Sequence, residues 1–415
     1  MRTALVQIEE ISAMSRFGSL QCAVLLMLIA GITCPVIAQP IGIVSVPDPS
    51  VGPPASGGGD SIAPVISSDS HHVLFTSTAN NLAVVTNSIP FRSACLPRLN
   101  VFLRDSNTTT MVSSSLSGTA GGNGDSIGTD LAECGLYALF ESSASDLVPG
   151  DTNNCSDVFW RDIAASTTRL VSVGSDGAAA NGESRESTMT PDGRYVAFVS
   201  DASNLVPGDT NRIADVFVMD MQSNRMTLVS DGAMSSSRAF GGGGSRSPDI
   251  TADGRYVVFY SSATNLVPGV GSAGDIYVRD LAAGITHWAS AGARAELAAA
   301  SWMGNPTNAV MSHPMISGDG HYVVFCVSPA SGSMMSAGLI LRYNMETGLT
   351  EVVHTNAFVV AATASDEMRC LDMTPDGETI AYLATPARRS PTSEAPPAFA
   401  SGMGELAQHC WPVRI

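Results

Sequence analysis

The chain repeats one short phrase along most of its length, and this repeat constrains the fold more than any other feature. The clearest copies are "TPDGRYVAF" and "TADGRYVVF", and the anchor residues of the six copies, 57 to 66 residues apart, are Asp69, Cys134, Asp192, Asp253, Asp319 and Asp376. An aromatic residue follows each anchor six positions later, namely Phe75, Phe140, Phe198, Phe259, Phe325 and Tyr382. A regular internal period indicates stacked copies of one supersecondary unit.

Each unit has the same order of strand and turn signals. The anchor turn leads into an apolar strand, a polar loop follows, and then come a second strand such as "DVFVMD" and a third such as "RMTLVS". A Gly/Ser-rich stretch then runs into the residues before the next anchor, which supply a fourth strand. No segment shows a convincing helical period. Four short antiparallel strands per unit are typical of the blades of a β-propeller.

The two ends of the repeat region complement each other. Residues 41–46, "IGIVSV", read like the end of a unit, whereas the last unit keeps no clear "DVFVRD". A closed ring accounts for both, because an N-terminal strand that completes the last blade leaves no open sheet edge. The sequence therefore predicts an all-β propeller of six four-stranded blades, with a closing strand and lead-in at 39–60, repeats at 61–385 and a Pro/Ala/Ser-rich tail at 386–415.

The repeat resembles the TolB-like β-propeller repeat of bacterial exported proteins, which is related to the WD-type propellers. The resemblance covers residues 41 to 385 and rests on phrases such as "TPDGRYVAF" and "DVFVMD". It implies the propeller fold. TolB also has an N-terminal α/β domain, for which there is no room between the leader and the first repeat. Its partner, a peptidoglycan-associated lipoprotein, is therefore carried over only as one possible partner.

The first 38 residues are expected to be a signal peptide. Residues 17–40 contain an apolar core followed by Val36 and Ala38 at the spacing of a cleavage site. Met14 is an alternative start, because a leader from there carries Arg16 in its n-region; lipid attachment at Cys34 is the rival to cleavage. No later run is long and apolar enough for a bilayer span. The expected location is periplasmic or secreted, without a transmembrane anchor in the mature chain.

The formal charge of -17 makes nucleic acid an unsuitable partner, since no basic face is available to neutralise phosphates. Six cysteines follow the leader, an even number that permits disulfides in an exported protein without specifying their pairing. They are Cys95, Cys134, Cys155, Cys326, Cys370 and Cys410. None of them forms a C-x-x-C pair, so no zinc ribbon or thioredoxin-like site is indicated.

Two loops share the spacing D-x-N-x-x-x-D and are the candidate metal site. Their residues are Asp151, Asn153 and Asp157 in one loop and Asp209, Asn211 and Asp215 in the other. Calcium prefers six to eight oxygen ligands, and such a loop offers several at once. The alternative is a turn, because Asp and Asn bond their own backbone in Asx-turns. The fourth unit lacks the first two of these residues, yet its strand "DIYVRD" continues.

Three further patterns are interpreted as structural or as weak catalytic signals. "GDSIG" at 124–128 matches the letters of a serine-hydrolase elbow but lacks the following helix. The Asp residues that end the second strand of the phrase are expected to cap turns; they are Asp105, Asp162, Asp220 and Asp280. His71 and His321 are expected to face water, and three other histidines would have to converge for a lyase metal site: His287, His313 and His354.

The function that fits these observations is a non-enzymatic, exported binding scaffold, stabilised by calcium if the loops bind it. Its partner is a protein or an envelope polymer that the sequence does not identify, and the chain is expected to be a monomer. The alternative is a lyase or hydrolase with its site over the central channel, suggested only by the fold. A third alternative is a decayed paralogue, in keeping with the incomplete last unit.

Overall fold

The computed structural model describes most of the repeat region. The described residues are 58–79, 81–83, 98–118, 120–234, 244–270, 274–299, 309–329, 335–360, 371–383 and 410–414. The leader, the segment at 41–46 and most of the C-terminal tail lie outside them. The predictions of a signal peptide and of closure by an N-terminal strand therefore stay predictions.

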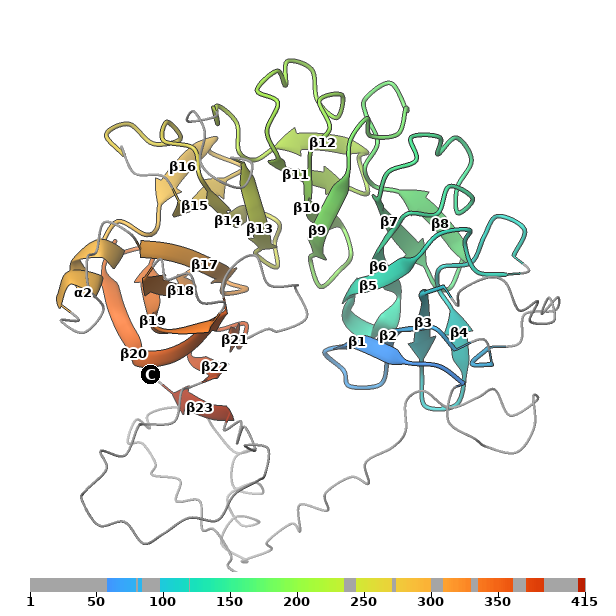
Figure 1. The fold of residues 1–415 in the computed structure, drawn as a ribbon, viewed down its shortest axis with the longest axis horizontal. Coiled ribbons are helices and arrows are strands. Elements are labelled where there is room, and N and C mark those ends of the chain that lie inside the picture. The colour runs from blue at the N-terminus through green and yellow to red at the C-terminus, as the bar shows by residue number, and fades with distance from the viewer. Residues whose placement is uncertain are drawn as a thin grey trace, which may run out of the picture. The chain divides into compact units, whose positions relative to one another are not determined.

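The repeats fold into successive antiparallel sheets, numbered first to sixth in chain order (Figure 1). The first sheet contains β1 (Ser61–Ile66), β2 (Val73–Ser77), β3 (Asn100–Arg104) and β4 (Thr109–Met111). The second contains β5 (Ser126–Leu131), β6 (Tyr137–Ser142), β7 (Asp157–Asp162) and β8 (Thr167–Leu170). The third contains β9 (Ser184–Met189), β10 (Tyr195–Ser200), β11 (Asp215–Asp220) and β12 (Arg225–Leu228).

The remaining sheets follow the same order, with a shorter sixth. The fourth contains β13 (Ser245–Ile250), β14 (Tyr256–Ser261), β15 (Asp275–Asp280) and β16 (Ile285–Trp288). The fifth contains β17 (Ala309–Ile316), β18 (Tyr322–Pro329), β19 (Met335–Asn344) and β20 (Thr350–Val360). The sixth has three described strands, β21 (Leu371–Met373), β22 (Thr379–Leu383) and β23 (Cys410–Arg414). This architecture confirms the predicted all-β propeller fold.

Strand β23 lies within the segment that the sequence analysis assigned to a tail. It pairs antiparallel with β22, from Thr379 opposite Arg414 to Leu383 opposite Cys410. The sequence analysis did not predict this strand for two reasons. Pro, Ala and Ser residues dominate the segment before it, and "CWPVR" itself is short and contains a proline.

The hydrophobic core lies between neighbouring sheets. The aromatic residues six positions after the anchors are buried, from Phe140, Phe198, Phe259 and Phe325 at 0% exposure to Tyr382 at 6%. In three sheets this Phe stacks on a Phe of the third strand, with ring centroids 5.5 to 5.9 Å apart. Strands sandwiched in this way are apolar on both faces, which explains why "YVVFY" shows no alternation.

Short helical segments also occur. The structure has a 3-10 turn at Glu133–Gly135 and a helix, α2 (Ala293–Ala299), after β16. The sequence analysis did not predict α2, although "ARAELAA" is rich in strong helix formers. Ala293 and Leu297 are buried with residues of the fourth and fifth sheets, and these apolar contacts hold the helix in place. Neither described helix is long and apolar enough to cross a membrane.

Candidate functional site

The two D-x-N-x-x-x-D loops join the second and third strands of the second and third sheets. Their last residues, Asp157 and Asp215, are the first residues of β7 and β11, and both are fully buried. The structure therefore places these carboxylates inside the protein, at the end of the sheet where the long loops lie. Each carboxylate needs donors there, because an unpaired buried charge is costly.

A serine and the loop asparagine supply these donors. In the second sheet, Ser172 Oγ donates to Asp157 Oδ1 at 2.6 Å, and Asn153 Nδ2 donates to Asp157 Oδ2 at 2.6 Å. The same Nδ2 donates to the carbonyl oxygen of Ala180 at 2.8 Å, while Asn153 Oδ1 accepts the N–H of Cys155 at 2.9 Å. All the polar groups of this asparagine side chain therefore have partners.

The third sheet repeats the arrangement residue for residue. Ser230 Oγ donates to Asp215 Oδ1 at 2.6 Å, and Asn211 Nδ2 donates to Asp215 Oδ2 at 2.7 Å. Asn211 Nδ2 also reaches the carbonyl oxygen of Ala233 at 3.1 Å, and its Oδ1 accepts the N–H of Ile213 at 3.1 Å. The repetition identifies the pattern as a built-in part of the blade.

The first aspartate of each loop is also largely buried. Asp151 and Asp209 are 5% and 9% exposed, and each accepts a hydrogen bond from the backbone N–H of the asparagine two residues later. Burial raises the pKa of both carboxyls. One oxygen of Asp151, Oδ1, is buried without a hydrogen-bond partner. An aspartate side chain that accepts the backbone N–H two residues later forms an Asx-turn, so each loop contains one.

The inner pair of carboxyls titrates far from the ordinary range. Burial raises the pKa of Asp157 and of Asp215 to about 6, although the serine and asparagine bonds act in the opposite direction. The neighbouring Asp151 and Asp209 add a smaller upward contribution through repulsion between like charges. Neither shift has a contribution from a nearby cationic side chain.

As arranged, these residues fit a hydrogen-bonded turn better than a calcium ion. Calcium needs six to eight oxygen ligands, whereas the amide nitrogen of Asn153, not its oxygen, faces Asp157. Turning the amide around would sacrifice its bond with the N–H of Cys155. Within the described ranges, no three His, Cys, Asp or Glu side chains are grouped so that they could hold a metal ion. Calcium binding stays a prediction of the sequence.

The fourth sheet shows what the buried carboxylate requires. Asp275, the first residue of β15, is fully buried and occupies the position of Asp157 and Asp215. Its Oδ1 accepts from Ser290 Oγ at 2.8 Å and from Trp288 Nε1 at 3.1 Å. In place of the asparagine, Arg294 of α2 donates to Asp275 Oδ1 at 2.7 Å and to Oδ2 at 3.3 Å. An arginine therefore takes the role of the asparagine where the loop is shorter.

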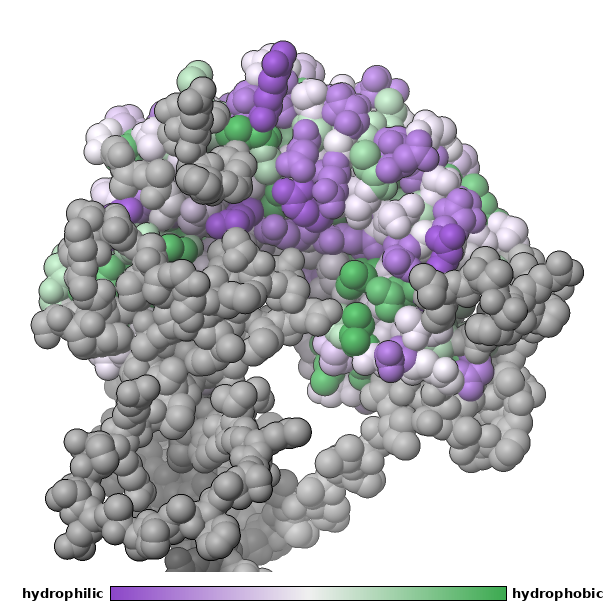
Figure 2. Space-filling model, viewed as in Figure 1, coloured by the Kyte–Doolittle hydropathy of each residue, from purple (hydrophilic) through white to green (hydrophobic). Residues whose placement is uncertain are grey.

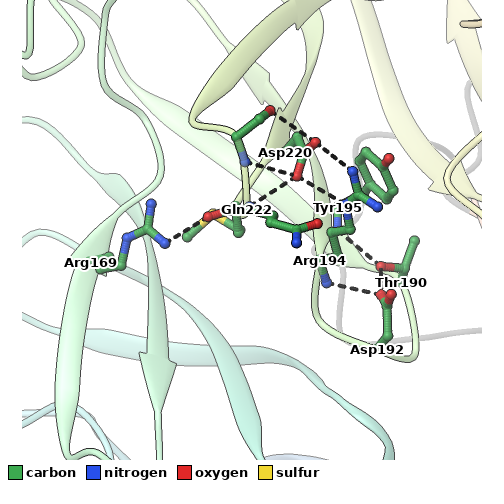
Figure 3. A network of polar contacts seen from close by, with 9 residues as sticks. Arg169, Thr190, Asp192, Arg194, Tyr195, Asp220 and Gln222 are labelled. Carbon is green, nitrogen blue, oxygen red and sulfur yellow. Dashed lines mark hydrogen bonds and ion pairs between the residues drawn. The ribbon is translucent and has the colours of Figure 1, made fainter.

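The other end of the blades carries the anchor turns and the recurrent Asp residues. Thr190 Oγ1 donates to Asp192 Oδ1 at 2.5 Å, and the N–H of Arg194 donates to the same oxygen at 3.0 Å. The guanidinium of Arg194 then binds Asp220 at 3.0 and 3.1 Å, as Figure 3 shows. The bond with Arg194 is the largest of the interactions that lower the pKa of Asp220.

The recurrent Asp residues cap short turns, as the sequence predicted. Each accepts a backbone N–H two or three residues further on, from Asn107, Ala165, Gln222, and Ala282 with Ala283. Asp280 also pairs with Arg255 at 2.8 Å.

Sequence reasoning missed a second set of carboxylates on the innermost strands, which link neighbouring sheets. Asp130 Oδ2 of the second sheet accepts the N–H of Met189 in the third sheet at 2.9 Å. Asp249 Oδ2 of the fourth sheet accepts the N–H of Ile316 in the fifth, also at 2.9 Å. Glu186 Oε2 of the third sheet accepts the N–H of Ser247 in the fourth at 2.6 Å. The signal in the sequence is an acidic residue within the strand that precedes the anchor turn.

The three histidines considered for a catalytic metal lie on different strands. His287 is on β16, the outermost strand of the fourth sheet, and His313 is on β17, the innermost strand of the fifth. His354 is on β20, where its Nδ1 lies 3.1 Å from the hydroxyl oxygen of Tyr382. His71 and His321 have side chains that are 74% and 51% exposed, as predicted.

The "GDSIG" segment has a structural role. Ser126 is the first residue of β5, is fully buried, and shares a hydrogen bond of 2.8 Å with Ser142 Oγ. The segment thus runs into a strand and not into a helix, which confirms the structural interpretation. Of the described cysteine side chains, Cys134 is exposed and Cys155 is half-buried, and both are free thiols, whereas Cys326 is buried. Cys95 and Cys370, two of the six cysteines that permit disulfides, lie outside the described residues.

Comparisons with known proteins add only fold-level likeness. No protein-family profile matches the chain, and no curated protein matches it. Among solved structures, it is similar to TolB from Acinetobacter baumannii, with 14% identity, a TM-score of 0.40, and coverage of 77% of this chain and 59% of that one. The chain thus spans less than two thirds of that TolB.

Two further structures show the same low level of similarity. A putative TolB from Agrobacterium tumefaciens has 14% identity and a TM-score of 0.40, with coverage of 75% of this chain and 87% of that one. An oligogalacturonate lyase from Vibrio parahaemolyticus has 11% identity and a TM-score of 0.44, with coverage of 76% and 68%.

Proposed function

We propose that this protein is a non-enzymatic, exported β-propeller that binds a partner through the loops at one end of its sheets. The observation that carries the proposal is that these loops are hydrogen-bonded to one another. Asn181 donates its backbone N–H to Asn204 Oδ1 at 2.9 Å, and its own Oδ1 accepts the N–H of Ser203 at 2.8 Å. Asn123 makes the corresponding bonds with Asp146 and Ser145 at 2.8 and 2.9 Å. A surface held in this way loses little conformational entropy when it binds.

The exposed side chains of these loops favour a protein as the partner. Leu116 is 58% exposed and Met234 is 67% exposed, and both belong to the connections between successive sheets. Exposed apolar side chains within a polar rim are common at protein-binding surfaces. The net charge of -17 would speed association with a basic partner and would make that rate fall with ionic strength.

Photo-crosslinking from single positions tests this proposal. A photoreactive amino acid is placed at Leu116 or Met234, and at Leu349 as the control. Leu349 is 69% exposed but lies just before β20, at the end of a sheet where the third and fourth strands are joined. We expect the two loop positions to give the same protein adduct from the cell envelope and the control to give none. Equal adducts from all three positions would refute a specific loop surface, and an adduct with a polysaccharide would change the class of partner.

The enzymatic alternative is suggested only by the fold, and its candidate histidines, His287, His313 and His354, lie on three strands of two sheets. Turnover of a polysaccharide or peptide by the purified protein would overturn the proposal of a binding scaffold. Export is the other part of the proposal and rests on the apolar segment at 17–40. Mass spectrometry of the mature protein checks it, with a first residue at 39 as the expected result.

A further inference from the structure

Strand β20 is much longer than the outermost strands of the preceding sheets. It has 11 residues, whereas β4 has 3 and β8, β12 and β16 have 4 each. In the second sheet, the outermost strand ends at Leu170, opposite Phe159. The corresponding pair in the fifth sheet is Leu341 with Val352, and β20 continues from there to Val360, opposite Met335 of β19. The fifth sheet therefore has an extension at the end of its outermost strand.

This strand has one open edge. The strand order in the fifth sheet is β17, β18, β19 and β20, and no described strand pairs with the far edge of β20 (Figure 1). An edge strand directs alternate N–H and C=O groups away from its neighbour, and proteins commonly protect such edges with short strands, prolines or charges. The sequence of β20, "TEVVHTNAFVV", contains no proline, lysine or arginine. Its one acid, Glu351, is paired with Arg342 of β19.

The accessible part of β20 begins at Val352. The first residue of the strand, Thr350, lies against the turn before α2, where a Cβ added to Gly292 would be 2.6 Å from Thr350 Oγ1. Further along, Val352 is 38% exposed and Thr355 is also exposed. The chain therefore covers the start of the strand itself and leaves these later positions in contact with solvent.

Two of the three sources of a further strand fit this edge poorly. A second copy would meet it along a contact about 36 Å long and about 5 Å wide, much less than the about 800 Å² per partner of a standard interface. The chain's own segment 384–409 contains four prolines, which lack the N–H that a strand needs. An extended segment of another protein fits better, because main-chain hydrogen bonds supply its affinity. The net charge of -17 favours a neutral or basic segment.

We propose that the open edge of β20, from Val352 to Val360, binds an extended, neutral or basic peptide segment of a partner protein as an additional strand of the fifth sheet. The recognition is by backbone hydrogen bonds and therefore selects a conformation more than a sequence. This site goes beyond the proposed loop surface and does not depend on it, because its donors and acceptors belong to one strand of one sheet.

Peptide selection on the full mature chain provides the probe. A phage library of random peptides about as long as β20 is panned against the protein, and an enriched peptide is synthesised. Thr355→Pro should raise its Kd at least about tenfold, because it disrupts the edge backbone. If that variant does not fold, Val352→Lys replaces it, since lysine blocks strand addition. The matched controls, Ile285→Pro and Ile285→Lys, alter an exposed position of β16 and should leave Kd unchanged.

Methylation of the peptide's backbone nitrogens, one at a time, tests the mode of binding. Alternate residues of an added strand donate to the edge, so every second methylation should raise Kd about tenfold and the others should have little effect. Failure to enrich any peptide, or methylation effects without this period of two, would overturn the proposal.

Two further measurements exclude other occupants and other sites. Hydrophobic residues gather over β1 and β5 (Figure 2), and Ile66 there is 64% exposed. A peptide that binds by apolar contact alone would bind there, so loss of binding in Ile66→Asp would contradict the site on β20. Light scattering of the unmodified protein should give the mass of one chain. A dimer that Thr355→Pro converts to a monomer would assign the edge to a second copy and would refute the proposal.

Discussion

Strand β11 begins with Asp215 and ends with Asp220, and the two carboxylates have opposite environments. Asp215 is fully buried, is bonded only to the neutral side chains of Ser230 and Asn211, and has its pKa raised to about 6. Asp220 is paired with Arg194 at the turn end of the strand, and its pKa is lowered. The same residue type, five positions apart, therefore favours folding at opposite ends of the pH range. Burial and partner decide the effect of the charge.

Strand β15 adds an intermediate case. Its first residue, Asp275, is buried like Asp215 but has a cationic partner in Arg294. Its last residue, Asp280, is bonded to Arg255 in the way that Asp220 is bonded to Arg194. The loop end of the blade thus accommodates a buried carboxylate with either a neutral or a charged donor. Substitutions at the two ends of the blade can test how much each kind of donor contributes to the free energy of unfolding.

The largest effect is expected for Arg294→Ala. The substitution leaves Asp275 as a fully buried carboxylate without its cationic partner, which should cost about 3–5 kcal/mol in the free energy of unfolding. Chemical denaturation measures this loss. Adding Asp275→Asn should recover part of it, because the remaining group is then neutral. A loss below about 1 kcal/mol would show that Ser290 and Trp288 alone satisfy the carboxylate.

Asn211→Ala should have the next largest effect. It removes the donor to Asp215 Oδ2, and an unsatisfied buried acceptor typically costs about 1–3 kcal/mol. The matched control is Gln222→Ala, an exposed amide at the turn end of the same strand, which should change the free energy of unfolding little. Similar losses in both variants would contradict the role assigned to Asn211.

The pH dependence of stability should separate the two ends of the blade. Because the folded pKa of Asp157 and Asp215 is about 6 and the ordinary value is 3.8, the folded state binds more protons between these values. Stability from these groups is fully present below 3.8 and is lost as pH rises through about 6. Moving from neutral pH to about pH 5 should therefore raise the free energy of unfolding by on the order of 1 kcal/mol for each Asp.

The double variant Asp157→Asn, Asp215→Asn is the control for this pH effect, since it removes both titrating groups. Its free energy of unfolding should change less between the two pH values than that of the unmodified protein. Asp220 and Asp280 act in the opposite sense: their lowered pKa values give stability that is present above 3.8 and is lost as pH falls below it. An unchanged pH profile in the double variant would contradict the burial of Asp157 and Asp215.

Arg194→Ala should have a smaller effect than any of these changes. The arginine side chain is 41% exposed, and exposed ion pairs are weakened by water and salt. We expect a small decrease in Tm that disappears at high ionic strength. Arg225→Ala, at an exposed position in β12, serves as the comparison. A salt-independent decrease as large as that of Asn211→Ala would remove the distinction between the two ends.

Calcium should have no effect on Tm if the loops are turns. A ligand that binds only the folded state must raise its stability, so melting in calcium and then in chelator is a direct test. A calcium-dependent rise that Asp151→Ala reduces would instead support the cation site suggested by the spacing of Asp151, Asn153 and Asp157. The unpartnered Oδ1 of Asp151 is the oxygen to which such an ion would bind first.

The sequence by itself determined the strand order of each repeat, the anchor turns and the capping role of residues such as Asp220. These features depend on neighbours within a few residues, as when Asp192 binds Thr190 and the N–H of Arg194. The buried aromatic residues six positions after the anchors were predictable for the same reason, since the phrase around them recurs. Local hydrogen bonds and strand periodicity depend on residues that are close in the sequence, so they can be predicted from the order of residues.

Only the tertiary structure decided which partner each carboxylate has. The spacing of Asp151, Asn153 and Asp157 suits a metal loop and a turn equally well, and only the structure shows that Asn153 Nδ2 donates to Asp157. Arg294 reaches Asp275 from 19 residues away, and Asp249 reaches the N–H of Ile316 from 67 residues away. The physical reason is that the packing of whole sheets creates these contacts, so the charge and burial of a side chain become defined only when its neighbour from the next sheet is in place.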